Sequence, residues 1–183
     1  SKGLPSSNGM MLAFSSMTGE TVAILRDEGW LTDMRTAIGG ALATRALARS
    51  NAKNVLILGT GIQARFQAIC LAQLMPERML NFSIWGRNPG AAQTAAHELS
   101  SQELIVKVAL ELEDEVRNAD IIITTTPAVS PLFEHGLVRN GTHVTAIGAD
   151  SLGKQELPVG LIKSASLRVC DLSKQSLSHG AVS

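Results

Sequence analysis

The stretch that most constrains the fold runs from Asn54 to Gln67 and reads N-V-L-I-L-G-T-G-I-Q-A-R-F-Q. Its apolar run, 55–58, predicts a fully buried parallel strand, because strands covered on both faces read as continuous apolar segments. The residues Gly59-Thr60-Gly61 interrupt this run, and an apolar periodicity that favours a helix begins at Ile62. A strand, a glycine turn and a helix in this order are typical of an α/β fold.

The turn has the G-x-G-x-x-A spacing of a dinucleotide site. Gly59 permits the tight turn, Gly61 lets a pyrophosphate approach the backbone, and Ala64 lets the helix pack close to the strand. The helix N-terminus would present free amides and a positive dipole end to the phosphates. A bare structural turn is the alternative, but the β/α alternation that follows favours the nucleotide site. We therefore expect cofactor contacts from Gly59, Thr60, Gly61, Ile62, Gln63 and Ala64.

Strands and helices alternate regularly after the turn. The pattern predicts a doubly wound parallel sheet of about six strands, which is the Rossmann type of α/β fold. The expected strands are 54–58, 80–85, 104–108, 120–124, 142–147 and 166–170. The expected helical segments are 62–75, 89–100, 111–118, 133–138, 156–162 and one that starts at Ser173.

Two further elements are expected before the sheet. Segments 10–16 and 21–26 predict a β-hairpin, and Thr32 is expected to cap a helix that continues to Ser50. Glycines 39 and 40 inside that helix indicate close packing or close ligand approach. Because two strands alone are marginally stable in water, the hairpin should complete a larger sheet or pair with another subunit.

Composition excludes several classes of partner. Lysine plus arginine and aspartate plus glutamate both number 16, and aromatics are 3% with no tyrosine. We therefore expect no nucleic-acid or membrane partner, since neither a basic field nor stacking faces are available and no apolar run is long enough to span a bilayer. Cys70 and Cys170 are interpreted as reduced core thiols of a cytoplasmic protein. The four histidines lack metal-ligand spacing, so no metal site is expected.

Cofactor choice can be inferred from the strand 80–85, which leads into Gly86, Arg87 and Asn88. NAD sites place an acid here to bind the ribose hydroxyls, whereas an arginine accommodates a 2′-phosphate. The acid is absent and Arg87 is present, which favours NADP(H). The alternative is that Arg87 is only a solvated surface residue.

Other candidate residues follow later strands, at the edge of the sheet where ligands of open α/β folds bind. Thr124, Thr125 and Thr126 would contact the nucleotide through hydroxyls and backbone, or would simply satisfy their own turn. Ile147 and Gly148 are expected beside the cofactor. Asp150 is either a carboxylate that orients or protonates a reacting nitrogen, or part of an Asx turn. Arg35 is either a clamp for a substrate carboxylate or an ordinary surface residue.

Four segments together resemble the ornithine cyclodeaminase/mu-crystallin family. They are L-T-D-M-R-T-A (31–37), L-G-T-G-I-Q-A (58–64), T-T-T-P (124–127) and A-I-G-A-D-S-L-G-K-Q-E-L (146–157). The resemblance covers essentially the whole chain in the family's order. The family includes cyclodeaminases, alanine dehydrogenases, ketimine and pyrroline-carboxylate reductases, and crystallins that bind NADPH.

The resemblance implies roles for individual residues. Arg35 matches the arginine that holds the substrate α-carboxylate, and its neighbour Thr36 is expected at the cofactor. Asp150 matches the catalytic aspartate beside the reacting carbon. Arg87 is similar to the residue of NADPH-using members.

The resemblance also implies a domain organisation. Residues 1–31 would belong to a partial substrate and dimerisation domain, 32–172 to the dinucleotide-binding domain, and 173–183 to the start of a returning helix. Family chains run further at both ends, so segments that carry a substrate-contacting lysine and most of the dimerisation sheet are expected to be missing. A homodimer is the implied assembly.

The resulting hypothesis is an NADPH-dependent reductase of a cyclic imino acid, such as pyrroline-2-carboxylate or piperideine-2-carboxylate. Arg35 would bind the carboxylate, and Asp150 would stabilise the iminium or supply the proton. One alternative is an NAD-dependent ornithine cyclodeaminase or amino-acid dehydrogenase. Another is a non-catalytic NADPH-binding protein, as crystallin members are. The last is a Rossmann protein outside this family, which would be indifferent to changes at Arg35.

Overall fold

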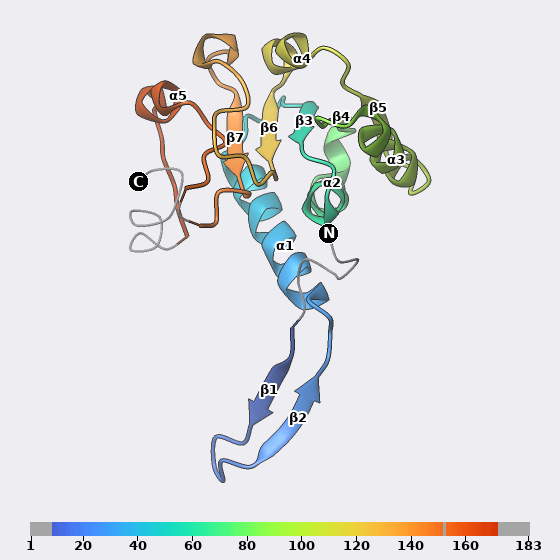
Figure 1. Cartoon of the computed structure of the whole chain (residues 1–183), viewed down its shortest axis with the longest axis vertical. Helices are drawn as coiled ribbons and strands as arrows, with labels where there is room; N and C mark the ends of the chain where they lie inside the picture. The colour runs from blue at the N-terminus through green and yellow to red at the C-terminus, as the bar shows by residue number, and fades with distance from the viewer. Residues whose placement is uncertain (1–8, 152, 172–183) are drawn as a thin grey trace.

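The computed structural model describes residues 9–151 and 153–171. Its centre is a parallel sheet with the strand order β5-β4-β3-β6-β7 (Figure 1). The chain crosses from β5 over to β6 on the far side of β3, so the strand order reverses between β3 and β6. This confirms the predicted doubly wound α/β fold, and it places the expected ligand crevice beyond the carboxyl ends of these strands. The strands are β3 (Asn54–Leu58), β4 (Asn81–Trp85), β5 (Ile105–Val108), β6 (Ile121–Thr124) and β7 (His143–Ala146).

Helices cover both faces of the sheet, because successive side chains of each buried strand point to opposite sides. Along β3, Val55 and Ile57 belong to one hydrophobic core, whereas Leu56 and Leu58 belong to the other. The first core also takes residues from α1 (Trp30–Leu47), α2 (Ile62–Leu74) and α3 (Pro89–Ser100). The second takes residues from α4 (Leu112–Asn118), the 3₁₀ turn η2 (His135–Leu137) and α5 (Val159–Ser164). A further 3₁₀ turn, η1, spans Pro76–Arg78.

Helix α1 starts two residues earlier than the predicted cap. Asp27 accepts a hydrogen bond from the Leu31 amide at 2.7 Å, and Gly29 precedes the first turn with a φ of 90°. Thr32 therefore lies inside the helix, which corrects the prediction that it is the cap. The expected close packing holds at Gly40, since a Cβ there would lie 2.6 Å from the buried amide of Gln67 on α2.

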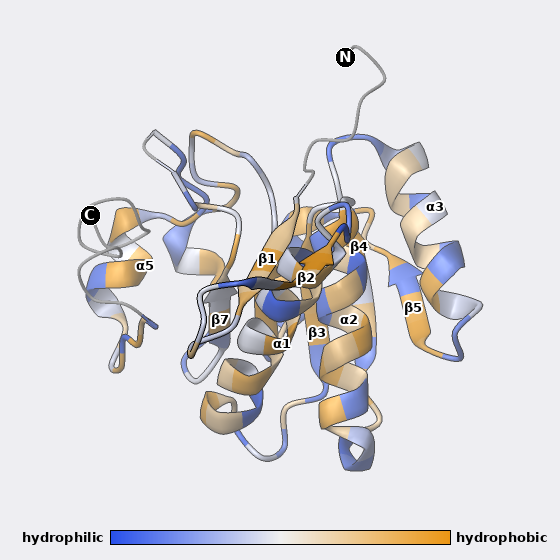
Figure 2. Ribbon diagram, turned by 90° about the horizontal axis from the view of Figure 1, so that it is seen from below, coloured by the Kyte–Doolittle hydropathy of each residue, from blue (hydrophilic) through white to orange (hydrophobic). Residues whose placement is uncertain are grey.

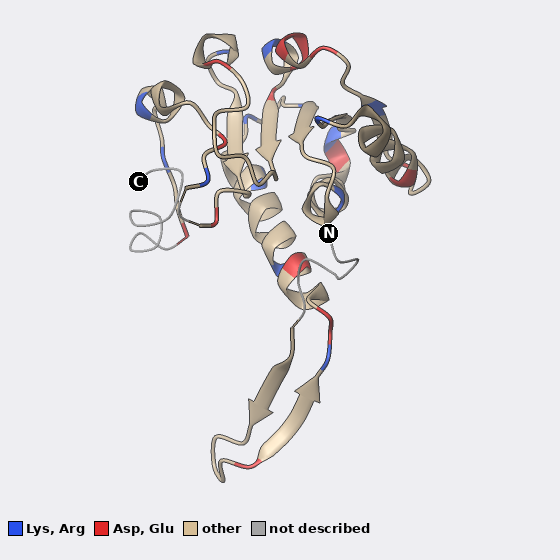
Figure 3. Ribbon diagram, in the orientation of Figure 1, with Lys and Arg blue, Asp and Glu red and all other residues tan. Residues whose placement is uncertain are grey.

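The predicted hairpin is confirmed as β1 (Met11–Phe14) and β2 (Thr21–Leu25), which pair antiparallel. It extends away from the sheet as an arm (Figure 1). Its strands are largely hydrophobic (Figure 2) and carry no charged residue (Figure 3). Phe14 and Ile24 are 57% and 60% exposed. The hairpin thus presents apolar side chains that no described part of the chain covers.

Two expectations near the C-terminal end are wrong. Residues 166–170 form no strand, so the described sheet has five strands where about six were predicted. Cys170 is exposed, whereas Cys70 is buried as expected and its pKa is raised by that burial. The helix expected from Ser173 lies outside the described residues. The helical piece expected at 156–162 is found at Val159–Ser164, because Glu156 and Leu157 enter the core before it.

Among the described residues, no helix is long and apolar enough to cross a membrane. The same part of the chain contains no group of three or more histidine, cysteine, aspartate or glutamate residues that could hold a metal ion.

Candidate functional site

The glycine turn between β3 and α2 has the backbone geometry that a phosphate site requires. Gly59 adopts a φ of 129°, and a Cβ there would lie 2.2 Å from the Thr125 hydroxyl. At Gly61 an added Cβ would meet nothing within 4 Å, so the space above this backbone is open. Gly61 also precedes α2 without a side-chain cap. The first amides of α2 are therefore available to an anion, which fits the pyrophosphate of a dinucleotide.

The turn is held from the helix side by Arg65, a residue that the sequence interpretation missed. Its Nη1 donates to the carbonyl oxygens of Thr60 at 2.5 Å and Gly61 at 3.1 Å. Its Nε donates to Glu98, and this hydrogen bond lowers the pKa of the Glu98 carboxyl. Because the guanidinium is engaged in this way, it supports the turn. A basic residue four positions after the second glycine of the turn was the available signal.

The remaining residues of the predicted turn have distinct places. Ala64 is completely buried against the sheet, as close helix packing requires, and Ile62 is exposed. The Gln63 side chain points toward α1, where its Nε2 donates to the carbonyl oxygen and the carboxylate of Asp33 at 3.0 and 3.1 Å. The Gln63 side chain thus joins the turn to the first part of α1, and only its backbone is left for the nucleotide.

The loop after β4 lies against this turn. A Cβ at Gly86 would be 2.5 Å from the Thr60 methyl group. Asn88 caps α3 by accepting a hydrogen bond from the Ala91 amide at 3.2 Å. Arg87 is exposed and makes no hydrogen bond or ion pair with any other described residue. The loop therefore offers one unpaired guanidinium and no carboxylate, which fits a 2′-phosphate better than a ribose diol.

The loops after β6 and β7 are joined by Glu156, which is fully buried. One carboxylate oxygen accepts from the Thr126 amide at 2.6 Å and from the Thr126 hydroxyl at 2.8 Å. The other accepts from the Thr124 hydroxyl at 2.8 Å and from the Gly148 amide at 2.9 Å. Sequence reasoning assigned Glu156 no role. The available signals were a single acid beside the apolar run L-P-V-G-L-I and its place in the segment 146–157 that resembles the family.

This arrangement engages the threonine hydroxyls inside the protein. Thr124 and Thr126 bond to Glu156, and the Thr125 hydroxyl donates to the Leu58 carbonyl at 3.1 Å. The three hydroxyls therefore donate to acceptors in other segments of the chain, which neither alternative described. Contacts from the backbone of 124–126 to a nucleotide stay a prediction, as do those of Ile147, whose amide bonds to Thr124 at 2.9 Å.

Asp150 lies exposed in the loop after β7 and is paired with a lysine. Lys154 Nζ donates to its carboxylate at 2.6 Å, and this hydrogen bond lowers the pKa of Asp150. The side chain is therefore a carboxylate at neutral pH. Such a group stabilises a neighbouring positive charge better than it donates a proton.

Arg35 lies exposed on α1, and no carboxylate pairs with it among the described residues. Its Nη2 contacts the hydroxyl of Thr36 at 3.3 Å, and that hydroxyl donates to the Thr32 carbonyl at 2.8 Å. The guanidinium is thus available to an external anion. The structure shows no direct contact between Arg35 and Asp150.

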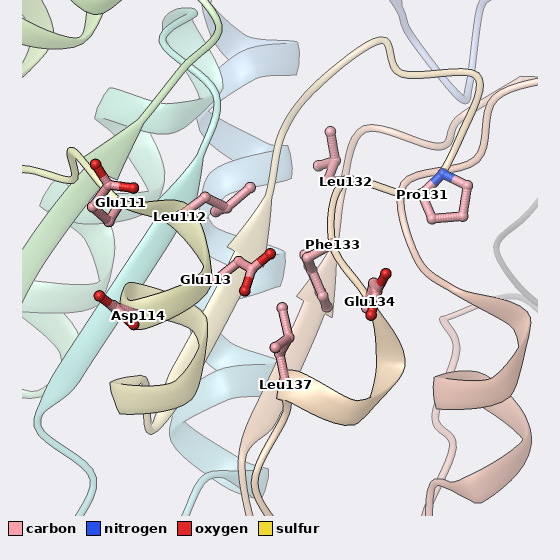
Figure 4. Close-up of a pocket in the computed structure, with 9 residues that line it drawn as sticks. All are labelled: Glu111, Leu112, Glu113, Asp114, Pro131, Leu132, Phe133, Glu134 and Leu137. Carbon is pink, nitrogen blue, oxygen red and sulfur yellow. The ribbon is translucent and has the colours of Figure 1, made fainter.

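A separate cavity of about 640 Å³ lies between α4 and the segment 131–137 (Figure 4). Its apolar floor includes Phe133 and Leu137. Its lining also contains four carboxylates, from Glu111, Glu113, Asp114 and Glu134. No residue of this lining is a predicted site residue, and the negative charge opposes phosphate binding. The glycine turn therefore stays the predicted nucleotide site.

The model of the ornithine cyclodeaminase/mu-crystallin family matches residues 1–183. The chain belongs to this family. Its similarity to individual members covers almost all of this chain but only part of theirs. The Delta(1)-pyrroline-2-carboxylate reductase of Paracoccus denitrificans is 33% identical over 180 residues, which are 97% of this chain and 55% of the relative.

Two solved structures of this family resemble the chain closely. The Delta(1)-pyrroline-2-carboxylate reductase of Thermococcus litoralis, in complex with NADH and L-proline, gives a TM-score of 0.89 at 29% identity. The superposed region is 99% of this chain and 55% of the Thermococcus litoralis chain. An archaeal alanine dehydrogenase dimer with bound NAD gives a TM-score of 0.88 at 32% identity, with coverages of 97% and 53%. The chain thus spans about half the length of the relatives it matches.

Proposed function

We propose that the natural protein reduces a cyclic imino acid, such as pyrroline-2-carboxylate or piperideine-2-carboxylate, to the amino acid with NADPH. The observation that carries this proposal is the open glycine turn beside the unpaired Arg87. The similarity to a reductase that holds NADH and L-proline supports the substrate class. The fold and the glycine turn suit a nicotinamide cofactor. The exposed guanidinium groups of Arg35 and Arg87 suit an anionic substrate and a phosphate group of the cofactor.

The choice of NADPH rests on Arg87. A guanidinium can bind a phosphate through two parallel N–H···O bonds, and a carboxylate that would repel the phosphate is absent from residues 85–89. The similar structures are complexes with NAD or NADH, so the proposed preference for NADPH rests on Arg87 of this chain and not on those structures.

The proposed chemistry gives Arg35 and Asp150 one task each. The bound nicotinamide would supply the hydride that reduces the C=N carbon. Arg35 would bind and orient the substrate carboxylate through paired hydrogen bonds. Asp150, which is held ionised by Lys154, would stabilise the positive charge of the protonated imine. We therefore favour an electrostatic role for Asp150 over proton donation.

A second candidate function is oxidation of an amino acid with NAD. The similarity to an archaeal alanine dehydrogenase with bound NAD favours it. The free Arg35 and the ionised Asp150 would serve that reaction equally well, because it is imine reduction in reverse for an open-chain substrate. The two candidates differ in the cofactor that they prefer and in the substrate that they accept.

We also propose that residues 1–31 belong to a second, substrate and dimerisation unit of a homodimer. The uncovered apolar hairpin supports this, and the similar alanine dehydrogenase is a dimer. A matched pair of variants, Ile24→Asp on the hairpin and Ile105→Asp on the exposed face of β5, tests the idea. Light scattering should show a smaller particle only for the hairpin variant.

The proposed function is tested by following NADPH and NADH oxidation side by side with pyrroline-2-carboxylate, using the longest natural form of the protein. Faster loss of NADPH that depends on the imino acid supports the reductase. Reduction of NAD by alanine, with no imino-acid reduction, would replace it by the dehydrogenase. Binding of NADPH without turnover of either substrate would indicate a non-catalytic binding protein.

A further inference from the structure

We propose that Glu156 is a positioning residue that fixes the place of Asp150 in the site. The proposal rests on the proposed function, since Asp150 matters only if a reaction occurs beside it. Glu156 is fully buried. It follows Asp150 in the sequence, whereas Gly148, whose amide donates to the Glu156 carboxylate, precedes Asp150. The Glu156 carboxylate therefore joins the two ends of the loop that presents Asp150.

The hydrogen-bonding capacity of the Glu156 carboxylate is fully used. An ionised carboxylate offers about four lone-pair sites, two on each oxygen. Oε1 accepts two hydrogen bonds from Thr126, and Oε2 accepts one each from Thr124 and Gly148. A buried charge is costly unless it is fully hydrogen-bonded, so this geometry has to be kept closely. An amide of the same shape would place two N–H groups against donors.

The Glu156 carboxylate adds a side-chain bridge to the backbone hydrogen bonds between the two loops, in which the Gly148 amide also contacts the Thr124 carbonyl at 3.2 Å and the Gln155 amide donates to the Ala128 carbonyl at 2.8 Å. Beyond β6 and β7 the backbone leaves the sheet, and Gly148 packs directly on Thr126. A Cβ on Gly148 would lie 2.2 Å from the Thr126 carbonyl oxygen and 2.7 Å from the Glu156 carboxylate. The approach is therefore close enough for one carboxylate to bridge both loops. Asp150 follows Gly148 by two residues, and Lys154, which pairs with it, precedes Glu156 by two.

Positioning and simple stabilisation by Glu156 predict different results. A purely structural Glu156 would change how much protein is folded, but each folded molecule would keep its Asp150 geometry. A positioning Glu156 would change the geometry of the Asp150–Lys154 pair in molecules that still bind NADPH. Only a positioning role predicts that a Glu156 variant changes kcat per bound cofactor and the apparent pKa in the pH profile of kcat.

The direct test is hydrogen exchange of single backbone amides by NMR in Glu156→Gln, using the longest natural form of the protein. We expect the Thr126 amide, which donates to Glu156, to exchange at least about tenfold faster than in the wild type, and the Gly148 amide, which also contacts the Thr124 carbonyl at 3.2 Å, to exchange faster by a smaller factor. The Thr125 amide, which bonds to the Leu58 carbonyl at 2.8 Å, should be unchanged. Glu134→Gln, which alters an exposed carboxylate outside the site, is the matched control and should change none of the three.

The kinetic test uses the same variant. We expect kcat with the imino acid, counted per NADPH-binding site, to fall at least about tenfold, while the dissociation constant of NADPH changes less than about threefold. The acidic limb of the kcat profile should move to higher pH, because the Lys154 contact that lowers the pKa of Asp150 is loosened. Unchanged exchange at Thr126 and Gly148, or an unchanged kcat and pH limb, overturns the positioning role.

A milder variant covers the case in which Glu156→Gln does not fold. Thr124→Val keeps the side-chain shape and removes one of the four donors, so smaller changes in the same direction are expected; no change would overturn the proposal. A wild-type protein that binds NADPH but reduces no imino acid would instead overturn the proposed function. The exchange experiment would then still show whether Glu156 holds the two loops.

Discussion

The loops at the C-terminal ends of the parallel strands form two groups, which differ in whether their polar groups already have hydrogen-bond partners. We call this end of the sheet its carboxyl edge; one half follows β3 and β4, and the other follows β6 and β7. Beyond β3 and β4, Gly61 faces open space, and Arg87 has no hydrogen-bond or ion-pair partner within residues 9–151 and 153–171. Beyond β6 and β7, the hydroxyls of Thr124 and Thr126 and the Gly148 amide donate to one buried carboxylate, that of Glu156. The comparison teaches that unsatisfied groups mark where a ligand is to bind, whereas saturated groups mark where geometry is to be maintained.

The largest expected contrast comes from adding one methyl group on each half. Gly148→Ala would place a Cβ 2.2 Å from the Thr126 carbonyl oxygen, so it should destabilise the fold by about 3 kcal/mol or more. Gly61→Ala meets no atom within 4 Å and should change stability by less than about 1 kcal/mol. It should nevertheless weaken NADPH binding at least about tenfold, because the methyl occupies the phosphate's space.

Urea unfolding and NADPH fluorescence titration measure these two effects separately. The comparison fails if Gly61→Ala loses as much stability as Gly148→Ala, or if it binds NADPH as tightly as the wild type does.

The next effect concerns Arg35, the free guanidinium on α1. Arg35→Ala should lower kcat/KM for carboxylate substrates by about 2–5 kcal/mol in transition-state terms, mainly through KM, if the substrate carboxylate is desolvated against it. The dissociation constant of NADPH should be unchanged. Arg45→Ala, at an exposed position near the end of the same helix, is the control. Equal losses in both variants would show that helix α1, and not the Arg35 charge, matters.

Asp150 gives a smaller effect with a defined pH dependence. Asp150→Asn should lower kcat and leave NADPH affinity nearly unchanged. Because Lys154 lowers the pKa of Asp150, the carboxylate stays ionised, and activity should be lost only as pH falls below the usual aspartate range. Lys154→Met removes that contact and should move the acidic limb upward. A limb that stays in place when Lys154 is changed would mean that another group titrates.

Asp120, at the N-terminal end of β6, is a second carboxylate whose hydrogen-bonding capacity is fully used, and it allows a further comparison. Burial alone would raise the pKa of Asp120, but hydrogen bonds from the Asn54 and Lys53 amides and the charges of Arg139 and Arg49 outweigh it and lower the pKa. Its stabilisation is therefore present above the unfolded-state pKa and is lost as pH falls through the folded-state value. Asp120→Asn should cost about 1–3 kcal/mol near pH 7, and less in acid.

The measurements are urea unfolding across pH and kcat at neutral pH. Since Asp120 lies far from the carboxyl edge in the sheet, kcat per NADPH site should not change. A fall in kcat comparable to that of Glu156→Gln would weaken the distinction between positioning and stabilising carboxylates.

Much of the fold follows from local sequence patterns. The apolar run 55–58 and the glycine turn predict the first strand and the start of α2, because burial and backbone freedom act within a few residues. The start of α1 does not follow in this way, since its cap comes from Asp27 in the preceding loop. The segment 166–170 has the composition of a strand, but composition cannot supply a neighbouring strand to pair with.

The site was predictable to a different degree on each half of the edge. Gly61 and Arg87 each belong to a short local motif, the glycine turn after β3 and the loop after β4, whose residue types and spacing predict a nucleotide contact. The role of Glu156 depends on three segments, around Thr124, Gly148 and Glu156 itself, that meet only in the folded chain. Sequence reasoning therefore left the threonine hydroxyls between the nucleotide and their own turn, whereas in the structure those of Thr124 and Thr126 donate to a buried carboxylate.

The central claim is that the open half of the edge binds a phosphorylated nicotinamide cofactor through Arg87. It is tested most directly by titrating NADPH and NADH into the wild type and into Arg87→Asp. The account predicts that the wild type binds NADPH at least about tenfold more tightly than NADH, and that the substitution weakens NADPH far more than NADH. Equal losses for both cofactors, or a wild type that prefers NADH, would contradict it.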